Sequence, residues 1–560
     1  MRRRKIQNFF GVLSSIFCCF FMMVCSVSTA QTNTPVAVSA AQPKALASDC
    51  NRISLTIACT TQGQIQGSIE NGLFAFRNIP FAAPPVGDLR WRPPAPPAVW
   101  EGIRDGSTFG NVCLQDDFSG GFTGSEDCLT LNVYTQSPSP DEKRPVMVFF
   151  HGGGWTVGSA QVPPYETAPP LAGHGVVVVT AQYRLGLLGF YADPKLTIEG
   201  GGSSGNYALR DMIAALQWVR ENISSFGGDR DRVMMFGQSA GSIDVQFILL
   251  SPLARKLFAR AGMESSAVIG GDFGSSVADA YPLYSQLPTL TGCDTASDEL
   301  ACLRAVPAST VIDLQLHSGA FPIICPNLDP DVVPEDPFIA LAEHGSPVPL
   351  LIGSNKEEGA ALGEDDGVPP LDEATYEAEI HAQFDPLKAG AGNHVLGLYP
   401  AAAYDSPRYA HIDVESDSGI TCWTRDVARV APGHHKVWRY LYTHRFENDP
   451  FLNSMRAFHG AELFLVFGNL SKIYYTEIPY TPSADEVALA NQTMDYWTRF
   501  AATGDPNSVE ERSWLPYDSK HDNIFQLDVT KRTINGYHND RCDYLDSLPL
   551  PGVGVPPITK

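Results

Sequence analysis

The chain has 560 residues, of which 44% are hydrophobic, and it carries a formal net charge of −23 at pH 7. This length accommodates one very large domain or several ordinary ones, with enough apolar side chains to fill a large core. A surface this acidic repels phosphate backbones, which excludes nucleic acid as an expected partner.

Residues 1–30 have the features of a secretory signal peptide. Four basic residues precede an apolar stretch from Phe9 to Val24, and small residues lead to the expected cleavage site after Ala30. The stretch is shorter than the roughly 20 residues of a spanning helix, which disfavours an uncleaved anchor. Bulky Val24 disfavours lipid attachment at Cys25. No other segment could cross a bilayer, so we expect a secreted or periplasmic mature protein with a charge of −27.

The mature chain has no obvious internal boundary. Residues 31–49 are rich in Ala, Thr, Pro and Ser, which predicts a flexible lead-in. Over residues 50–560, apolar runs and helical patterns alternate with short turns rich in Gly and Pro. We therefore expect one large α/β domain over 50–560.

Strand and helix patterns alternate in the first half of this domain. Continuous β-branched and aromatic runs predict buried strands over 146–150, 175–183 and 232–236. Helices are predicted over 206–222 and directly after Ser239, because apolar residues recur there at helical spacing. This order predicts a large, mostly parallel sheet with helices on both faces. The apolar stripes comprise Leu209, Ile213, Leu216 and Val219 in the first helix, and Ile243, Phe247 and Leu250 in the second.

The segment "GQSAG" places Ser239 between Gly237 and Gly241, where a predicted strand meets a predicted helix. In that context G-x-S-x-G forms a sharp turn that exposes a nucleophilic serine at the sheet edge. The alternative is a serine that only caps the following helix. The strand before it favours the nucleophile.

The segment "FFHGGGWTVG" (149–158) is a candidate oxyanion site, because its glycines follow a predicted strand. Backbone amides can approach a substrate closely where no Cβ intervenes. Gly153 and Gly154, together with the amide of Ala240, are the expected donors to the oxyanion that forms on attack. The alternative is an ordinary glycine turn.

Several segments resemble the type B carboxylesterase and cholinesterase family of α/β-hydrolases. "SEDCLTLNVYT" (125–135) resembles one signature of this family, and "FGGDRDRVMMFGQSAG" (226–241) resembles the other, with Met235 where a branched aliphatic residue is usual. The resemblance extends over residues 61–545. It implies the α/β-hydrolase fold, hydrolysis of small-molecule carboxylic esters, and no cofactor.

The resemblance also implies the partners of Ser239. "VPLLIGSNKEEGA" (348–360) matches the acid motif with Glu358 in the acid position, and "FHGAELFLVFG" (458–468) matches the histidine motif with His459. Their order in the chain is that of α/β-hydrolases. His459 would take the Ser239 proton, and Glu358 would orient the imidazole.

Other titratable residues compete for these roles. Without the resemblance, His444 is a serious candidate for the base, because it lies just beyond a predicted strand. The acidic residues near Glu358 are expected to be solvated surface groups; they are Glu357, Asp365 and Asp366.

Nine cysteines remain after the three in the leader are removed. The resemblance implies the disulfides Cys113–Cys128, Cys293–Cys302 and Cys422–Cys542. Cys50 and Cys59 could form a further pair outside the usual pattern, and Cys325 is then expected to be a small buried apolar residue. No Cys/His cluster has the spacing of a zinc site, so no metal is expected.

Two departures from the family pattern bear on the substrate. Only fourteen residues separate Cys113 from Cys128, and none is tryptophan, whereas cholinesterases and related lipases carry a choline-binding tryptophan or a lid in this loop. Gln238 stands where glutamate is common, which removes a negative charge beside Ser239 and eases the approach of anionic substrates. We therefore expect a soluble-substrate esterase that accepts bulky or carboxylated natural-product or xenobiotic esters, with Gln238 as a specificity residue.

Three other functional classes fit the sequence less well. A lipase acting on acylglycerols would need an interfacial lid, which the short loop disfavours. Non-catalytic binding proteins of the family have lost triad residues, whereas all three positions are filled here. Hormone-sensitive-lipase-like enzymes share the HGGG turn, but the chain length, "SEDCL" and "KEEG" fit them poorly.

Overall fold

The computed structural model describes most of the chain beyond the predicted leader. The expected signal peptide over 1–30 and the lead-in over 31–49 lie outside the described part, as do Asp365 and Asp366. Within the described ranges, no helix has the length and apolar character needed to cross a membrane. These ranges are 54–266, 276–321, 324–361, 370–473 and 479–549.

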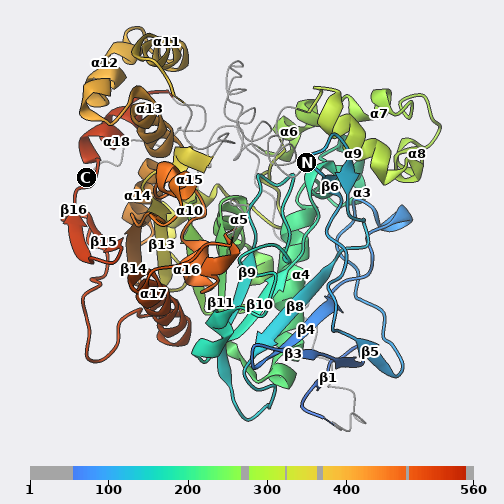
Figure 1. Ribbon diagram of the computed structural model, residues 1–560. Helices are drawn as coiled ribbons and strands as arrows, with labels where there is room; N and C mark the ends of the chain where they lie inside the picture. The colour runs from blue at the N-terminus through green and yellow to red at the C-terminus, as the bar shows by residue number, and fades with distance from the viewer. Residues whose placement is uncertain (1–53, 267–275, 322–323, 362–369, 474–478, 550–560) are drawn as a thin grey trace.

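An eleven-stranded sheet forms the centre of the molecule (Figure 1). The predicted strands over 146–150, 175–183 and 232–236 are confirmed as three neighbours in its parallel central block. Antiparallel strands complete both edges, so the sheet is mixed. In spatial order the strands are β16 (Arg532–Asn535), β15 (Asn523–Leu527), β14 (Val437–Tyr442), β13 (Leu350–Asn355), β12 (Arg260–Glu264), β11 (Gly228–Gln238), β9 (Arg144–Phe150), β10 (Val177–Ala181), β8 (Thr130–Thr135), β4 (Leu73–Pro80) and β3 (Ser68–Glu70).

Successive side chains of the central strands enter two different cores. In β9, Val146 and Val148 belong to one apolar cluster, while Met147 and Phe149 belong to the other. This alternation follows from the period of two in a strand, and burial on both faces explains the continuous apolar runs. The helices α4 (Tyr207–Asn222) and α5 (Ala240–Leu250) contribute to the first cluster, and α16 (Leu463–Val466) and α17 (Ala484–Thr503) contribute to the second.

The helical stripes predicted from the sequence are confirmed. All the predicted stripe residues of α4, and Ile243 and Phe247 of α5, are buried in the first cluster, and Leu250 packs against it. Met235 is fully buried in the same cluster, so its departure from the family pattern is a change within the core. The other α-helices of the described residues are α2 (Gly186–Phe190), α3 (Pro194–Glu199), α6 (Val277–Tyr284), α7 (Leu287–Leu290), α8 (Glu299–Ala305), α9 (Ala308–His317), α10 (Pro337–His344), α11 (Glu373–Phe384), α12 (Ala391–Leu398), α13 (Pro407–Ser416), α14 (Cys422–Val430), α15 (Pro450–Met455) and α18 (Asn539–Leu545).

Two small sheets and a third apolar cluster lie outside the main sheet. Strands β1 (Ile57–Cys59), β2 (Gln64–Gln66) and β5 (Ile103–Asp105) form the first small sheet, and β6 (Gln115–Asp116) pairs with β7 (Phe122–Thr123) in the second. The third cluster joins α11, α12, α13 and α18 at the upper left of Figure 1. Because β6 pairs with β7 between Cys113 and Cys128, the loop that this disulfide closes is a compact hairpin.

The structure contains three disulfides among the described residues, in the pairing that the family resemblance implies. Cys59 is also disulfide-bonded, and its expected partner Cys50 lies outside the described part. Cys325 retains its thiol and is buried in the first apolar cluster. The disulfides are Cys113–Cys128, Cys293–Cys302 and Cys422–Cys542.

The turn from β11 into α5 is packed too closely for side chains at its two glycines. A Cβ at Gly241 would lie 2.2 Å from the carbonyl oxygen of Phe150, and a Cβ at Gly237 would lie 2.3 Å from the carbonyl oxygen of Gly241. Both distances are far below van der Waals contact. The two glycines thus allow α5 to begin directly against the end of β9.

Replacing Gly241 with alanine is expected to destabilise this turn. The Gly241→Ala variant should lower the free energy of unfolding by about 1–3 kcal/mol, because backbone atoms must move to admit the Cβ. Gly397→Ala is the matched control, since a Cβ at this position in α12 meets nothing within 4 Å. Urea and thermal unfolding of both variants provide the measurement. Equal unfolding midpoints for Gly241→Ala and the unmodified protein would contradict the close packing.

Candidate active site

Ser239 occupies the turn between β11 and α5 in a strained backbone conformation. Its φ of 56° and ψ of −127° lie in a region that costs a non-glycine residue about 1–3 kcal/mol. The Ser239 amide donates to the carbonyl of Glu264 at 3.0 Å, and its carbonyl accepts from the amides of Ser242 and Ile243. Its side chain makes no capping hydrogen bond to α5 in the described structure. The alternative of a serine that only caps this helix is therefore not supported. The side chain of this half-buried residue is left for another role.

The glycine loop after β9 lies directly against this turn. A Cβ at Gly152 would lie 2.9 Å from both the Ser239 Cβ and the carbonyl oxygen of Gln238. Gly153 and Gly154 have positive φ values of 119° and 59°, which glycine adopts readily. The amide of Ala240 begins α5 and has no acceptor within the helix. The structure thus places the loop that contains Gly153 and Gly154 against the turn of Ser239 and Ala240.

Buried contacts of Trp155 and Tyr183 hold the glycine loop in place. Trp155, which follows the loop, donates its indole N–H to Asp244 of α5 at 2.9 Å, and its carbonyl accepts from the Gly186 amide at 2.7 Å. Burial raises the pKa of the Asp244 carboxyl well above its usual value. On the other side of the loop, the Tyr183 hydroxyl donates to the carbonyl of His151 at 2.7 Å, and the two rings stack. None of these contacts has a signal in the sequence.

Glu358 and His459 meet near the carboxyl ends of the parallel strands. Glu358 follows β13 and begins the short 3₁₀ helix η6 (Glu358–Ala361), while His459 follows α15. The His459 Nδ1 lies 2.6 Å from Oε2 of Glu358, whose Oε1 accepts the amide of Asn355 at 2.6 Å. Burial lowers the pKa of His459, but the charge and hydrogen bond of Glu358 outweigh this effect and raise the pKa above its usual value. An imidazole held in this way can accept a proton at Nε2.

The Nε2 of His459 faces the residue immediately before Ser239. Its distance from Nε2 of Gln238 is 3.1 Å. With the Nδ1 proton directed at Glu358, the Gln238 amide donates to the lone pair on the histidine Nε2. The side chain of Gln238 is buried, and its Oε1 faces Gly152. Gln238 therefore lies between the histidine and the glycine loop, a contact that its sequence position alone does not predict.

Further buried carboxyl groups lie behind this pair. Glu462 is fully buried and accepts a hydrogen bond from the Asn355 side chain, which also donates to the carbonyl of Phe458 at 2.7 Å. Burial and the nearby charge of Glu358 raise the pKa of Glu462 to about 7. Glu264 at the end of β12 accepts the indole N–H of Trp497 at 2.5 Å. The only feature of the sequence that places Glu462 near the site is its position three residues after His459 in the histidine motif.

His444, the other candidate for the base, lies in different surroundings from His459. His444 lies between two carboxylates, with Nδ1 at 3.1 Å from Asp528 and Nε2 at 3.2 Å from Glu486, and its pKa is raised to about 9 against the opposing effect of burial. Both of its ring nitrogens therefore have acidic partners.

The expectation that Glu357 is a solvated surface residue is wrong, because Glu357 is only 2% exposed. A hydrogen bond from the Ala457 amide and two neighbouring cations compensate its burial.

In the described part of the chain, two glutamates and a histidine lie close enough together to be considered as a metal site. Glu335, Glu343 and His344 have potential ligand atoms within 4.8 Å of one another, but all three residues are exposed. None of them contacts Ser239, Glu358 or His459 in the hydrogen bonds described above. The metal-binding potential of this group therefore has no link to the candidate active site.

Comparison with known proteins agrees with the fold. A model of the carboxylesterase family matches residues 54–545. A para-nitrobenzyl esterase from Bacillus subtilis (strain 168) is 34% identical over 490 residues, which cover 84% of this chain and 94% of that protein. A fumonisin B1 esterase from Sphingopyxis macrogoltabida is 34% identical over 480 residues, which cover 82% of this chain and 84% of that protein.

A mammalian relative and a solved structure extend this agreement. Carboxylesterase 1D from Rattus norvegicus is 32% identical over 513 residues, which cover 82% of this chain and 87% of that protein. A solved structure of PNB esterase has a TM-score of 0.72 at 30% identity and covers 88% of this chain and 100% of its own. The chain therefore belongs to the carboxylesterase family, and it is a carboxylic ester hydrolase with the α/β-hydrolase fold.

Proposed function

We propose that this enzyme hydrolyses esters through an acyl-enzyme on Ser239, with His459 as the general base and Glu358 as the residue that orients it. The observation that carries the proposal is the 2.6 Å contact between His459 Nδ1 and Glu358 Oε2, in a histidine whose Nε2 faces Gln238 beside Ser239. The strained, half-buried turn at Ser239 adds support, because such turns present a nucleophile at the sheet edge.

The proposed reaction has two steps. His459 takes the Ser239 proton at Nε2 while Oγ attacks the ester carbonyl, so the Ser239 hydroxyl replaces Gln238 as the donor to Nε2. The amides of Gly153, Gly154 and Ala240 bind the oxyanion, and loss of one such donor typically costs about 100-fold or more in rate. The protonated histidine then gives its proton to the leaving alcohol, and water attacks the acyl-enzyme to release the acid.

The proposed substrates are soluble esters, including bulky or carboxylated natural-product and xenobiotic esters. The neutral Gln238 supports this, because a carboxylate in the substrate then meets no negative charge at this position. The compact hairpin between Cys113 and Cys128 favours soluble esters over the alternative of acylglycerols in a lipase. Relatives named para-nitrobenzyl esterase and fumonisin B1 esterase are consistent with this range. The filled triad positions disfavour the alternative of a non-catalytic binding protein.

We also propose that the mature enzyme is secreted or periplasmic. Disulfides form and persist in oxidising compartments, and three link distant or neighbouring parts of the described chain. The basic and apolar composition of residues 1–30 supports an export signal.

The role of Ser239 and the choice of base are tested together. Fluorophosphonate labelling should modify Ser239 in the unmodified protein, and Ser239→Ala and His459→Ala should each lower kcat by about 10⁴-fold or more. His444→Ala is the matched control. It should keep kcat within about twofold but unfold more easily, because it leaves Glu486 and Asp528 without their histidine. Full ester hydrolysis by Ser239→Ala would refute the mechanism.

The role of Gln238 in specificity is tested by adding a charge. Gln238→Glu should lower kcat/KM about three- to tenfold for esters with a carboxylate near the scissile bond, relative to neutral esters of the same size, because like charges then repel. Gln136→Glu makes the same charge change after β8, where Gln136 contacts Arg144 at the start of β9, and should leave the ratio unchanged. If the two variants give the same ratio, Gln238 does not select on charge.

The export signal is tested by N-terminal sequencing. Protein recovered from the medium or periplasm of an expressing host should begin at Gln31, because small residues precede the expected cleavage site. A variant with Leu13→Arg in the apolar stretch should remain inside the cell with an intact N-terminus. Recovery of the exported protein with Met1 in place would rule out cleavage after Ala30.

A further inference from the structure

The segment before His459 is hydrogen-bonded to the segment before the acid. The Glu357 amide donates to the carbonyl of Ala457 at 3.1 Å, and Oε2 of the Glu357 side chain accepts the Ala457 amide at 3.2 Å. The side chain of Asn355 donates to the carbonyl of Phe458 at 2.7 Å. These contacts tie the residues that lead into the proposed acid to those that lead into the proposed base.

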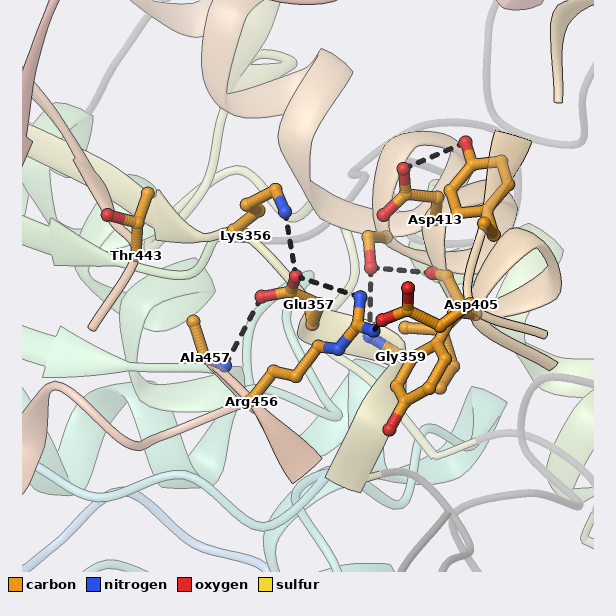
Figure 2. A network of polar contacts seen from close by, with 12 residues as sticks. Lys356, Glu357, Gly359, Asp405, Asp413, Thr443, Arg456 and Ala457 are labelled. Atoms are coloured by element: carbon orange, nitrogen blue, oxygen red, sulfur yellow. Dashed lines mark hydrogen bonds and ion pairs between the residues drawn. The ribbon is translucent and has the colours of Figure 1, made fainter. Parts of the chain in front are cut away.

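Glu357 is a buried charged group with two cationic neighbours. Its carboxylate lies 2.9 Å from Nζ of Lys356 and 3.9 Å from Nη1 of Arg456, and Figure 2 shows it between these side chains and the Ala457 amide. Arg456 also forms an ion pair with Asp405. A buried carboxyl group is costly without such partners, and the two cations and the Ala457 amide offset the cost of burying Glu357.

Arg456 stands at the point where the chain leaves α15 and turns toward the histidine. Its φ of 59° and ψ of −133° place it in the same sparsely populated region as Ser239. Such a conformation persists only where the surrounding contacts enforce it. Its guanidinium carbon lies 3.4 Å from the centroid of the Tyr409 ring. Asp405 forms an ion pair with the far end of the Arg456 side chain, as Figure 2 shows. The side chain of Arg456 therefore holds the turn that directs Ala457 toward Glu357.

These contacts matter because no local chain geometry relates the acid to the base. Glu358 and His459 are 101 residues apart in the sequence, yet their side chains meet at 2.6 Å. Glu357 is the neighbour of the acid, and Ala457 lies two residues before the base. A misplacement of about 1 Å in such a constellation can cost about 100-fold in rate. A link this close to both residues controls their separation directly.

We propose that Glu357, held by Arg456 and Lys356, is a positioning residue that fixes the His459 segment against Glu358 and so sets kcat without contributing to ester binding. This inference rests on the proposed function, in which His459 and Glu358 act as base and orienting acid. Glu357 acts through Ala457 and touches neither the ester nor the reacting atoms.

The test compares two substitutions at Glu357 that separate its hydrogen bond from its charge. Glu357→Ala removes both, whereas Glu357→Gln removes the charge and keeps an oxygen that can accept the Ala457 amide. Rates are expressed per active site, as titrated with a fluorophosphonate, so that unfolded protein does not count. Glu357→Ala should lower kcat by about tenfold or more with KM within about twofold, and Glu357→Gln should retain kcat within about threefold.

The pH dependence of kcat/KM provides a readout that a purely structural role does not move. His459 faces the carboxyl groups of Glu358 and Glu462 and the amide of Gln238. Glu358 raises the pKa of His459 against the effect of burial, so a looser contact lowers that pKa. Because the base acts in its neutral form, the acidic limb should move to lower pH in Glu357→Ala by about 0.5 unit or more. It should stay nearly in place in Glu357→Gln.

Matched controls keep the outcomes distinct. Glu142→Gln removes a carboxylate that pairs with Arg144 at the start of β9, and it should change neither kcat nor the pH profile. If Glu357→Ala does not fold, Glu357→Met replaces it, since methionine fills the space without an oxygen acceptor and its sulfur accepts only weakly. An unchanged kcat in the alanine or methionine variant, or an equal shift of the acidic limb in Glu357→Gln, would overturn the positioning role. A wild-type enzyme that the fluorophosphonate does not label at Ser239 would instead refute the proposed function.

Discussion

The hydrogen bond between His459 and Glu358 is the contact around which the rest of the site is arranged. Glu358 is 1% exposed, and a carboxylate so deeply buried is costly unless it is paired and hydrogen-bonded. The imidazole at 2.6 Å and the Asn355 amide at 2.6 Å meet that requirement. Glu358 and His459 come from distant segments, so the fold must bring the end of β13 and the segment after α15 together. The end of β11, which leads to Ser239, must lie beside them.

The surroundings of this contact show two ways of burying a carboxyl group. Asp244 and Glu462 have pKa values raised by burial, and each accepts a hydrogen bond, from Trp155 and Asn355 respectively. Glu357 instead lies between two cations and a backbone amide. In the first way, burial favours the neutral acid; in the second, two cations and an amide offset the cost of burying the side chain. Asp244 links the glycine loop to α5, and Glu357 links the segment after β13 to the segment before His459.

Two turns of this arrangement are strained in the same way. Ser239 and Arg456 share an unfavourable backbone conformation, and each begins a turn that directs a residue of the site. Close glycine packing and the hydrogen bond to Glu264 hold the first turn, whereas an ion pair and stacking on Tyr409 hold the second. Tertiary contacts, rather than local preference, therefore maintain both conformations.

The sequence by itself determined the central strands, the helices α4 and α5 and the order of the candidate residues, because buried runs, helical stripes and glycine spacing are local patterns. It also led to Ser239, Glu358 and His459 through motifs that surround each of them. The contact of Gln238 with His459, the burial of Glu357 and the separate surroundings of His444 were decided only by the tertiary structure. From the sequence alone, a charged side chain such as Glu357 is expected at the surface. Only the folded chain brings the amide and the cations that make its burial possible.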